Sequence, residues 1–167
     1  MFVNEARKEY ADLMLSNESG ECKYAKVNML NNIELAMYMY NKTYVKRGIK
    51  RIPEEISTMN CRPTGFNELY WDLIKADSIE DIKEKSTILM KIVKSFAQQM
   101  KDKVIIKKEI MDADINGTYE EIYSNWKNKM YHAVDINDVY LSLMTAASCQ
   151  NFYNEMYSEY NIEKIDL

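Results

Sequence analysis

Two aspartates, Asp112 and Asp114, have the types and spacing that metal chemistry uses. Paired carboxylates supply the hard oxygen ligands that Mg²⁺ prefers, and such pairs support metal-dependent transfer of phosphate-containing groups. Enzymes that use the pair this way place it after a strand and a phosphate-binding loop, and the sequence before Asp112 contains neither. We therefore interpret the pair as part of a solvated loop and expect no metal site in this chain.

The single histidine, His132, is the next candidate for acid–base chemistry. A catalytic imidazole needs a partner that orients it or a nucleophile beside it. Helical ribonucleases of the HEPN class place an arginine a few residues before their histidine, whereas residues 126–131 contain none. We interpret His132 as a surface or capping residue.

A third candidate is Glu34, which lies between Asn31 and Asn41 in a mostly apolar segment. Buried carboxylates acquire raised pKa values and often serve in catalysis or binding. The pattern leaves three interpretations open: a buried polar network, the wall of a pocket, or an exposed helix face. Glu34 and Asn31 are our candidate substrate-binding residues.

These residues must be positioned by helices, because the chain has few residues that make turns. It contains 4 Gly and 2 Pro in 167 residues, too few for a β-sandwich or barrel. Apolar residues recur at helical spacing over segments that we expect to be helices. The expected helices cover 4–15, 22–47, 54–59, 66–74, 78 to beyond 103, 118–131 and 139–160. The sequence predicts an all-α antiparallel bundle in a single helical domain (1–167), with a core at 1–108 and a C-terminal helical extension at 109–167.

Composition also limits the classes of partner. The net charge of −4 argues against a general nucleic-acid binder, and no apolar run is long enough to cross a membrane. The three cysteines lack paired spacing, which is typical of reduced thiols in a cytoplasmic protein.

Several short motifs share their order with one known family. They are Glu9-Tyr10-Ala11, the turn Arg62-Pro63-Thr64-Gly65-Phe66 with the following Asn67-Glu68-Leu69, and the helix start Asp77-Ser78-Ile79-Glu80. Over residues 1–105 this order resembles the C-terminal helical domain of the kanamycin (aminoglycoside) nucleotidyltransferase family, a HEPN-like domain found in antibiotic-resistance transferases. The resemblance implies that Glu9 is a general base toward a substrate hydroxyl.

The family's catalytic α/β domain, with its phosphate loop and aspartates, has no counterpart here. The resemblance thus implies a non-catalytic accessory or substrate-binding domain, with ATP and Mg²⁺ entering only with a catalytic partner domain. The alternatives are a HEPN-like ribonuclease or toxin, or a plain helical interaction module. We also expect a twofold homodimer, with the first helix and its residues Leu13 and Met14 at the interface.

Overall fold

The computed structural model describes residues 2–166 and has an all-α fold, as the sequence predicts. No strand occurs among the described residues, and the one isolated bridge joins Lys108 and Tyr160. The helical elements are α1 (Phe2–Leu15), α2 (Ser19–Tyr40), the 3-10 turn η1 (Ile49–Arg51), α3 (Ile52–Ser57), α4 (Phe66–Lys75), α5 (Ile79–Val104), the π-helical segment η2 (Glu120–Trp126), α6 (Lys127–Asp135) and α7 (Val139–Glu159).

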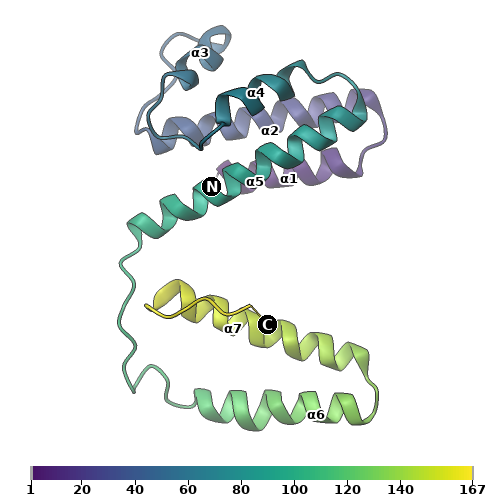
Figure 1. The fold of residues 1–167 in the computed structure, drawn as a ribbon, viewed down its shortest axis with the longest axis vertical. Coiled ribbons are helices and arrows are strands. Elements are labelled where there is room, and N and C mark those ends of the chain that lie inside the picture. The colour runs from purple at the N-terminus through teal and green to yellow at the C-terminus, as the bar shows by residue number, and fades with distance from the viewer. Residues whose placement is uncertain (1, 167) are drawn as a thin grey trace. The chain divides into compact units, whose positions relative to one another are not determined.

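The chain divides into two compact units, Met1–Val104 and Ile105–Leu167. The first unit contains α1 to α5, and the second contains η2, α6 and α7. Figure 1 shows both units. The sequence-based boundary at residue 108 lies a few residues after this division.

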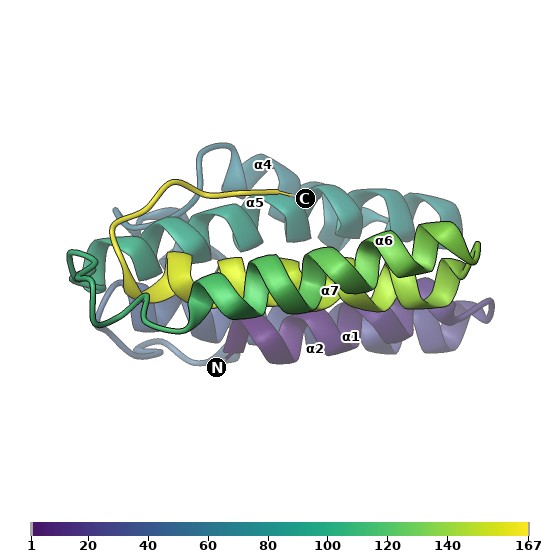
Figure 2. The ribbon, with the colours of Figure 1, turned by 90° about the horizontal axis from the view of Figure 1, so that it is seen from below.

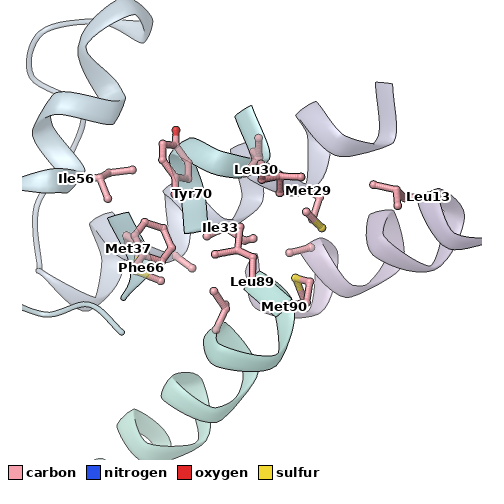
Figure 3. Packing of buried hydrophobic residues seen from close by; sticks show 14 of the residues in the cluster. Leu13, Met29, Leu30, Ile33, Met37, Ile56, Phe66, Tyr70, Leu89 and Met90 are labelled. Atoms are coloured by element: carbon pink, nitrogen blue, oxygen red, sulfur yellow. The ribbon is translucent and has the colours of Figure 1, made fainter. Parts of the chain in front are cut away.

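In the first unit, the helices enclose one apolar core. Helix α2 lies at its centre, because α1, α3 and α5 all pack against it, while α4 packs against α5. Figure 3 shows the interlocking side chains, among which Leu13, Ile33 and Leu89 are fully buried. Ala6 and Leu13 of α1 belong to this core. The expectation of a dimer interface at the first helix is therefore wrong for Leu13, whose side chain is already used within its own unit.

Helix α2 ends at Tyr40, seven residues before the predicted end at Arg47. Lys42 adopts a positive φ of 52°, which an α-helix cannot continue through. The side chain of Asn41 holds the new chain direction, since its Nδ2 donates to the carbonyl oxygen of Cys61 (2.7 Å) and its Oδ1 accepts from the Cys61 amide (2.9 Å). The apolar periodicity of 22–47 did not reveal this long-range bond.

Other boundaries agree with the sequence. Pro53 lies in the first turn of α3, where its missing N–H costs no helical hydrogen bond. Ser78 precedes α5, and its Oγ accepts from the Asp81 amide at 3.2 Å, as the predicted capping pair requires.

In the second unit, α6 and α7 lie side by side as a helical hairpin (Figure 1 and Figure 2). Asp138 caps α7 by accepting from the Leu141 amide at 2.9 Å. The capping box predicted at 118–121 does not form, because the Glu121 amide donates to the carbonyl oxygen of Gly117 (3.3 Å) and not to the Thr118 hydroxyl. That hydroxyl itself donates to the carbonyl oxygen of Ile115 (2.7 Å). The chain there winds as the π-helical segment η2.

Within residues 2–166, no helix is both long enough and apolar enough to cross a membrane.

Candidate functional site

Glu34 on α2 pairs with Tyr70 on α4. The Tyr70 hydroxyl donates to Oε1 of Glu34 at 2.5 Å. The Tyr70 ring lies in the core, and its hydroxyl points away from the apolar cluster (Figure 3). The second carboxylate oxygen of Glu34, Oε2, has no hydrogen bond to any described residue, which leaves it available to a ligand.

Burial controls the protonation of this pair. It raises the pKa of Glu34 above its ordinary value of 4.5, and the hydrogen bond from Tyr70 opposes that rise only in part. Burial and the neighbouring carboxylate raise the pKa of Tyr70, so its hydroxyl keeps its proton and remains a donor. Glu34 therefore takes up a proton more readily than an exposed glutamate does.

One turn further along α2, Tyr38 connects a second carboxylate to the same region. Its hydroxyl donates to Oε2 of Glu55 at 2.8 Å, and Glu55 also accepts from the backbone amides of Lys46 (3.2 Å) and Arg47 (2.7 Å). Partial burial alone would raise the pKa of Glu55, but these three hydrogen bonds together lower it. Burial raises the pKa of Tyr38, and the nearby charges of Glu55 and Glu34 raise it further.

Tyr38 and Glu55 line a cavity of about 510 Å³. Lys46 and Arg47 also line it, yet their amides are the groups that Glu55 binds. Glu55 therefore has a clear structural task, which is to hold the 42–48 segment against α2 and α3.

Glu9, the general base implied by the family resemblance, lies in a different groove, between α1 and α2. This groove has a volume of about 430 Å³. Its polar lining is acidic and contains no lysine or arginine; its members are Glu9, Asp12, Ser16, Gly20, Glu21, Tyr24 and Ala25. We refer to it as the acidic groove. The Ser16 hydroxyl donates to Glu21 at 2.8 Å, while the Tyr24 ring is largely exposed.

The candidate residues Glu9, Asn31 and Glu34 do not share one pocket, but α2 connects them. Tyr24 of the acidic groove and Asn31 lie seven residues apart, and so on the same face of α2 about 10 Å apart. Asn31 is exposed, and Glu34 follows it by one turn. Asn31 therefore lies on the Tyr24 side of α2, whereas the Glu34 side chain is directed to Tyr70 of α4.

The remaining candidates, Asp112, Asp114 and His132, belong to the second unit. Asp112 is exposed, and Asp114 accepts from the Met111 amide at 3.0 Å within its own loop. His132 is exposed on α6, and no described side chain orients it. All three cysteines are free. Over residues 2–166, no three histidine, cysteine or acidic side chains gather into a group that could hold a metal ion.

Sequence reasoning missed Tyr70, Tyr38 and Glu55. The helical spacing of the two tyrosines marks them as apolar core residues. Glu55 looks like an ordinary acidic residue in the first turn of a short helix. The one available signal is that a tyrosine at a core position needs a partner for its hydroxyl.

Comparison with models of protein families, with curated proteins and with solved structures finds no significant match for this chain.

Proposed function

We propose that the first unit is a substrate-binding accessory domain that works with a nucleotidyltransferase-type catalytic domain and holds a cationic amino sugar in the acidic groove. The observation that carries the proposal is the lining of this groove. Glu9, Asp12 and Glu21 supply three carboxylates, and no cation neutralises them within the groove. Its volume of about 430 Å³ lies in the range of small-molecule sites.

The chemistry of the groove fits protonated amines that carry hydroxyl groups. Carboxylates bind ammonium groups through charge-assisted hydrogen bonds, which are stronger than neutral ones. The exposed ring of Tyr24 offers a face on which a cationic sugar can lie. Asn31, which is exposed and lies seven residues after Tyr24 on the same face of α2, extends the polar surface for a second sugar ring.

Glu9 is the proposed general base. A sugar hydroxyl that attacks phosphorus must lose its proton, and a carboxylate beside the bound sugar can accept it. In this proposal ATP and Mg²⁺ enter with the catalytic partner domain, as the family resemblance implies. We expect no nucleotide transfer by this chain alone.

Calorimetric titration of the full chain with kanamycin tests the proposal. We expect the double variant Glu9→Gln/Asp12→Asn to weaken binding about tenfold or more, since it removes two charge-assisted contacts. The matched control is Glu80→Gln/Glu84→Gln, which removes two exposed carboxylates of α5 outside the groove. Absence of binding by the unaltered chain, or equal weakening by both double variants, would contradict the proposal.

We further propose that the chain forms a homodimer, with the second unit as its interface. The evidence is an exposed apolar stripe on α7 at helical spacing, made of Tyr140, Leu143, Met144 and Ala147. Residues 139–154 contain no charged residue, so a second copy of the stripe would meet no repulsion. Exposed apolar faces of this kind mark interaction surfaces, and closed twofold contacts are their commonest form.

A further inference from the structure

We infer that a second groove, between α1 and α5, binds a small organic phosphate. This groove has a volume of about 370 Å³. Three cations, two hydroxyl-bearing side chains and one methionine line it: Arg7, Tyr10, Thr87, Met90, Lys91 and Lys94. We refer to it as the basic groove. Arg7 and Glu9 point to different faces of α1, so the basic groove and the acidic groove are separate sites.

The three cations of the basic groove have no anionic partner. None of them forms a salt bridge with a described residue, whereas Lys8, Lys23 and Lys85 elsewhere in the first unit each pair with a carboxylate. In a chain with 26 acidic and 22 basic residues, three unpaired cations around one groove leave its charge uncompensated. An anionic ligand would supply the missing charge.

The neighbours of the three cations on α1 and α5 also include no acidic residue. Positions three and four residues before and after Arg7 on α1 are Val3, Asn4, Tyr10 and Ala11. The corresponding neighbours of Lys91 and Lys94 on α5 are Thr87, Ile88, Met90, Ser95, Ala97 and Gln98, besides the two lysines themselves. Lys91 and Lys94 lie one turn apart on the same helix, where like charges repel each other. An anion bound between them would relieve that repulsion.

The floor of the groove is ordered and partly apolar. Met90 is buried and belongs to the apolar core of the first unit (Figure 3). The hydroxyls of Tyr10 and Thr87 lie 2.9 Å apart, and Thr87 also donates to the carbonyl oxygen of Lys83 at 2.8 Å. Since the Thr87 proton is used in this way, Tyr10 donates to Thr87, and its ring is fixed against α5. The Tyr10 ring and Met90 offer an apolar surface to the organic part of a ligand.

A phosphate monoester fits these features better than a carboxylate does. It carries close to two negative charges at neutral pH and three terminal oxygens, one for each cation. The planar guanidinium of Arg7 matches two phosphate oxygens, while the lysines act as flexible point charges. The groove thus combines cations for the phosphate with an apolar floor for the group it is attached to.

Nuclear magnetic resonance titration of the full chain tests the inference with phenyl phosphate and inorganic phosphate as probes. We expect phenyl phosphate to shift the amide signals of Tyr10, Thr87 and Lys91, and to bind more tightly than inorganic phosphate. The double variant Lys91→Glu/Lys94→Glu should weaken phenyl phosphate about tenfold or more. The control Lys101→Glu/Lys103→Glu makes the same charge change on exposed residues of α5 and should retain binding.

Three results would overturn the inference: no shifts at the groove, equal affinity for the two probes, or equal weakening by both double variants. Folding of each variant is checked by the dispersion of its amide signals. The inference does not rest on the proposed function, because the probes are anions and the kanamycin test uses a cation in the acidic groove. Either result can fail while the other stands.

Discussion

At the scale of single residues, the hydrogen bond between Glu34 and Tyr70 is one of the contacts that join α2 to α4. The tyrosine is 2% exposed, so its hydroxyl must find a partner inside the protein. Glu34 supplies that partner and is itself partly withdrawn from water, which raises its pKa. One bond thus connects core packing to the chemistry of the α2 surface.

We expect Glu34→Ala to lower the free energy of unfolding by about 1–3 kcal/mol, because it leaves the Tyr70 hydroxyl buried without a partner. Denaturant unfolding measures this cost. Adding Tyr70→Phe to Glu34→Ala should recover part of the loss, since the orphaned hydroxyl is then gone. If the double variant is as unstable as the sum of the single variants, the bond does not have this role.

The pH dependence of stability gives a second test of Glu34. Its raised pKa means that the folded protein holds this proton more tightly than the unfolded chain does. Its contribution to stability is therefore full below the ordinary pKa of 4.5 and is lost as the pH rises through the folded value. Glu34→Gln has no proton to lose, so its stability relative to the unaltered protein should increase from about pH 4 to about pH 7. A difference that is flat or falls over this range would contradict the assignment.

The sequence alone identified Glu34 as a candidate residue but did not identify its partner, Tyr70. Glu34 stands out as a carboxylate in an apolar helix, whereas Tyr70 is 36 residues away and its helical spacing only marks it as core. Lys26 was missed for the same reason. Its Nζ donates to the carbonyl oxygens of Leu73, Ile74 and Ala76 at the end of α4, and burial lowers its pKa. Long-range pairings of this kind leave no local pattern.

At the scale of elements, local signals located the starts of α3 and α5 but not the end of α2. Ser78 and Pro53 act on residues within one turn, so their effect can be read from adjacent sequence. The end of α2 depends on Asn41, which is bonded to Cys61, 20 residues away. The 42–48 segment that follows is held by Glu55, and no periodicity reports that bond.

We expect Glu55→Gln to loosen the 42–48 segment, because a neutral amide with one acceptor oxygen cannot replace a carboxylate that accepts three hydrogen bonds. Hydrogen exchange of the Lys46 and Arg47 amides should become faster, while the Cys61 amide, held by Asn41, serves as the internal control. In the unaltered protein, the lowered pKa of Glu55 means that its stabilisation is present above the ordinary value of 4.5 and is lost as the pH falls through the folded value. Unchanged exchange at Lys46 and Arg47 would show that the segment is held by other contacts.

At the scale of the whole molecule, the two units differ in how much they bury. The first has a continuous core with fully buried side chains such as Ile33 and Leu89. In the second, the buried side chains among the described residues are Ala133, Thr145 and Tyr160. The sequence predicted helices in both, but periodicity alone does not distinguish an apolar stripe that faces a core from one that remains exposed.

We expect sedimentation equilibrium to give twice the chain mass of 19.7 kDa at tens of micromolar protein, through contacts of the α7 stripe. Leu143→Glu/Met144→Glu should convert the dimer to a monomer, because both side chains are exposed and the new charges would face each other. Ser95→Glu/Gln99→Glu, which adds two charges at exposed polar positions of α5 in the first unit, is the control. A monomeric unaltered protein would end the dimer proposal.

The central claim is that the acidic groove binds a cationic amino sugar, and mapping the contact by nuclear magnetic resonance tests it most directly. Kanamycin added to the labelled full chain should shift the amide signals of Glu9, Asp12, Glu21 and Tyr24, with smaller changes reaching Asn31. The shifts should weaken as salt is added, because ammonium–carboxylate contacts at an open groove are screened. No shifts, or shifts confined to residues outside α1 and α2, would contradict the claim.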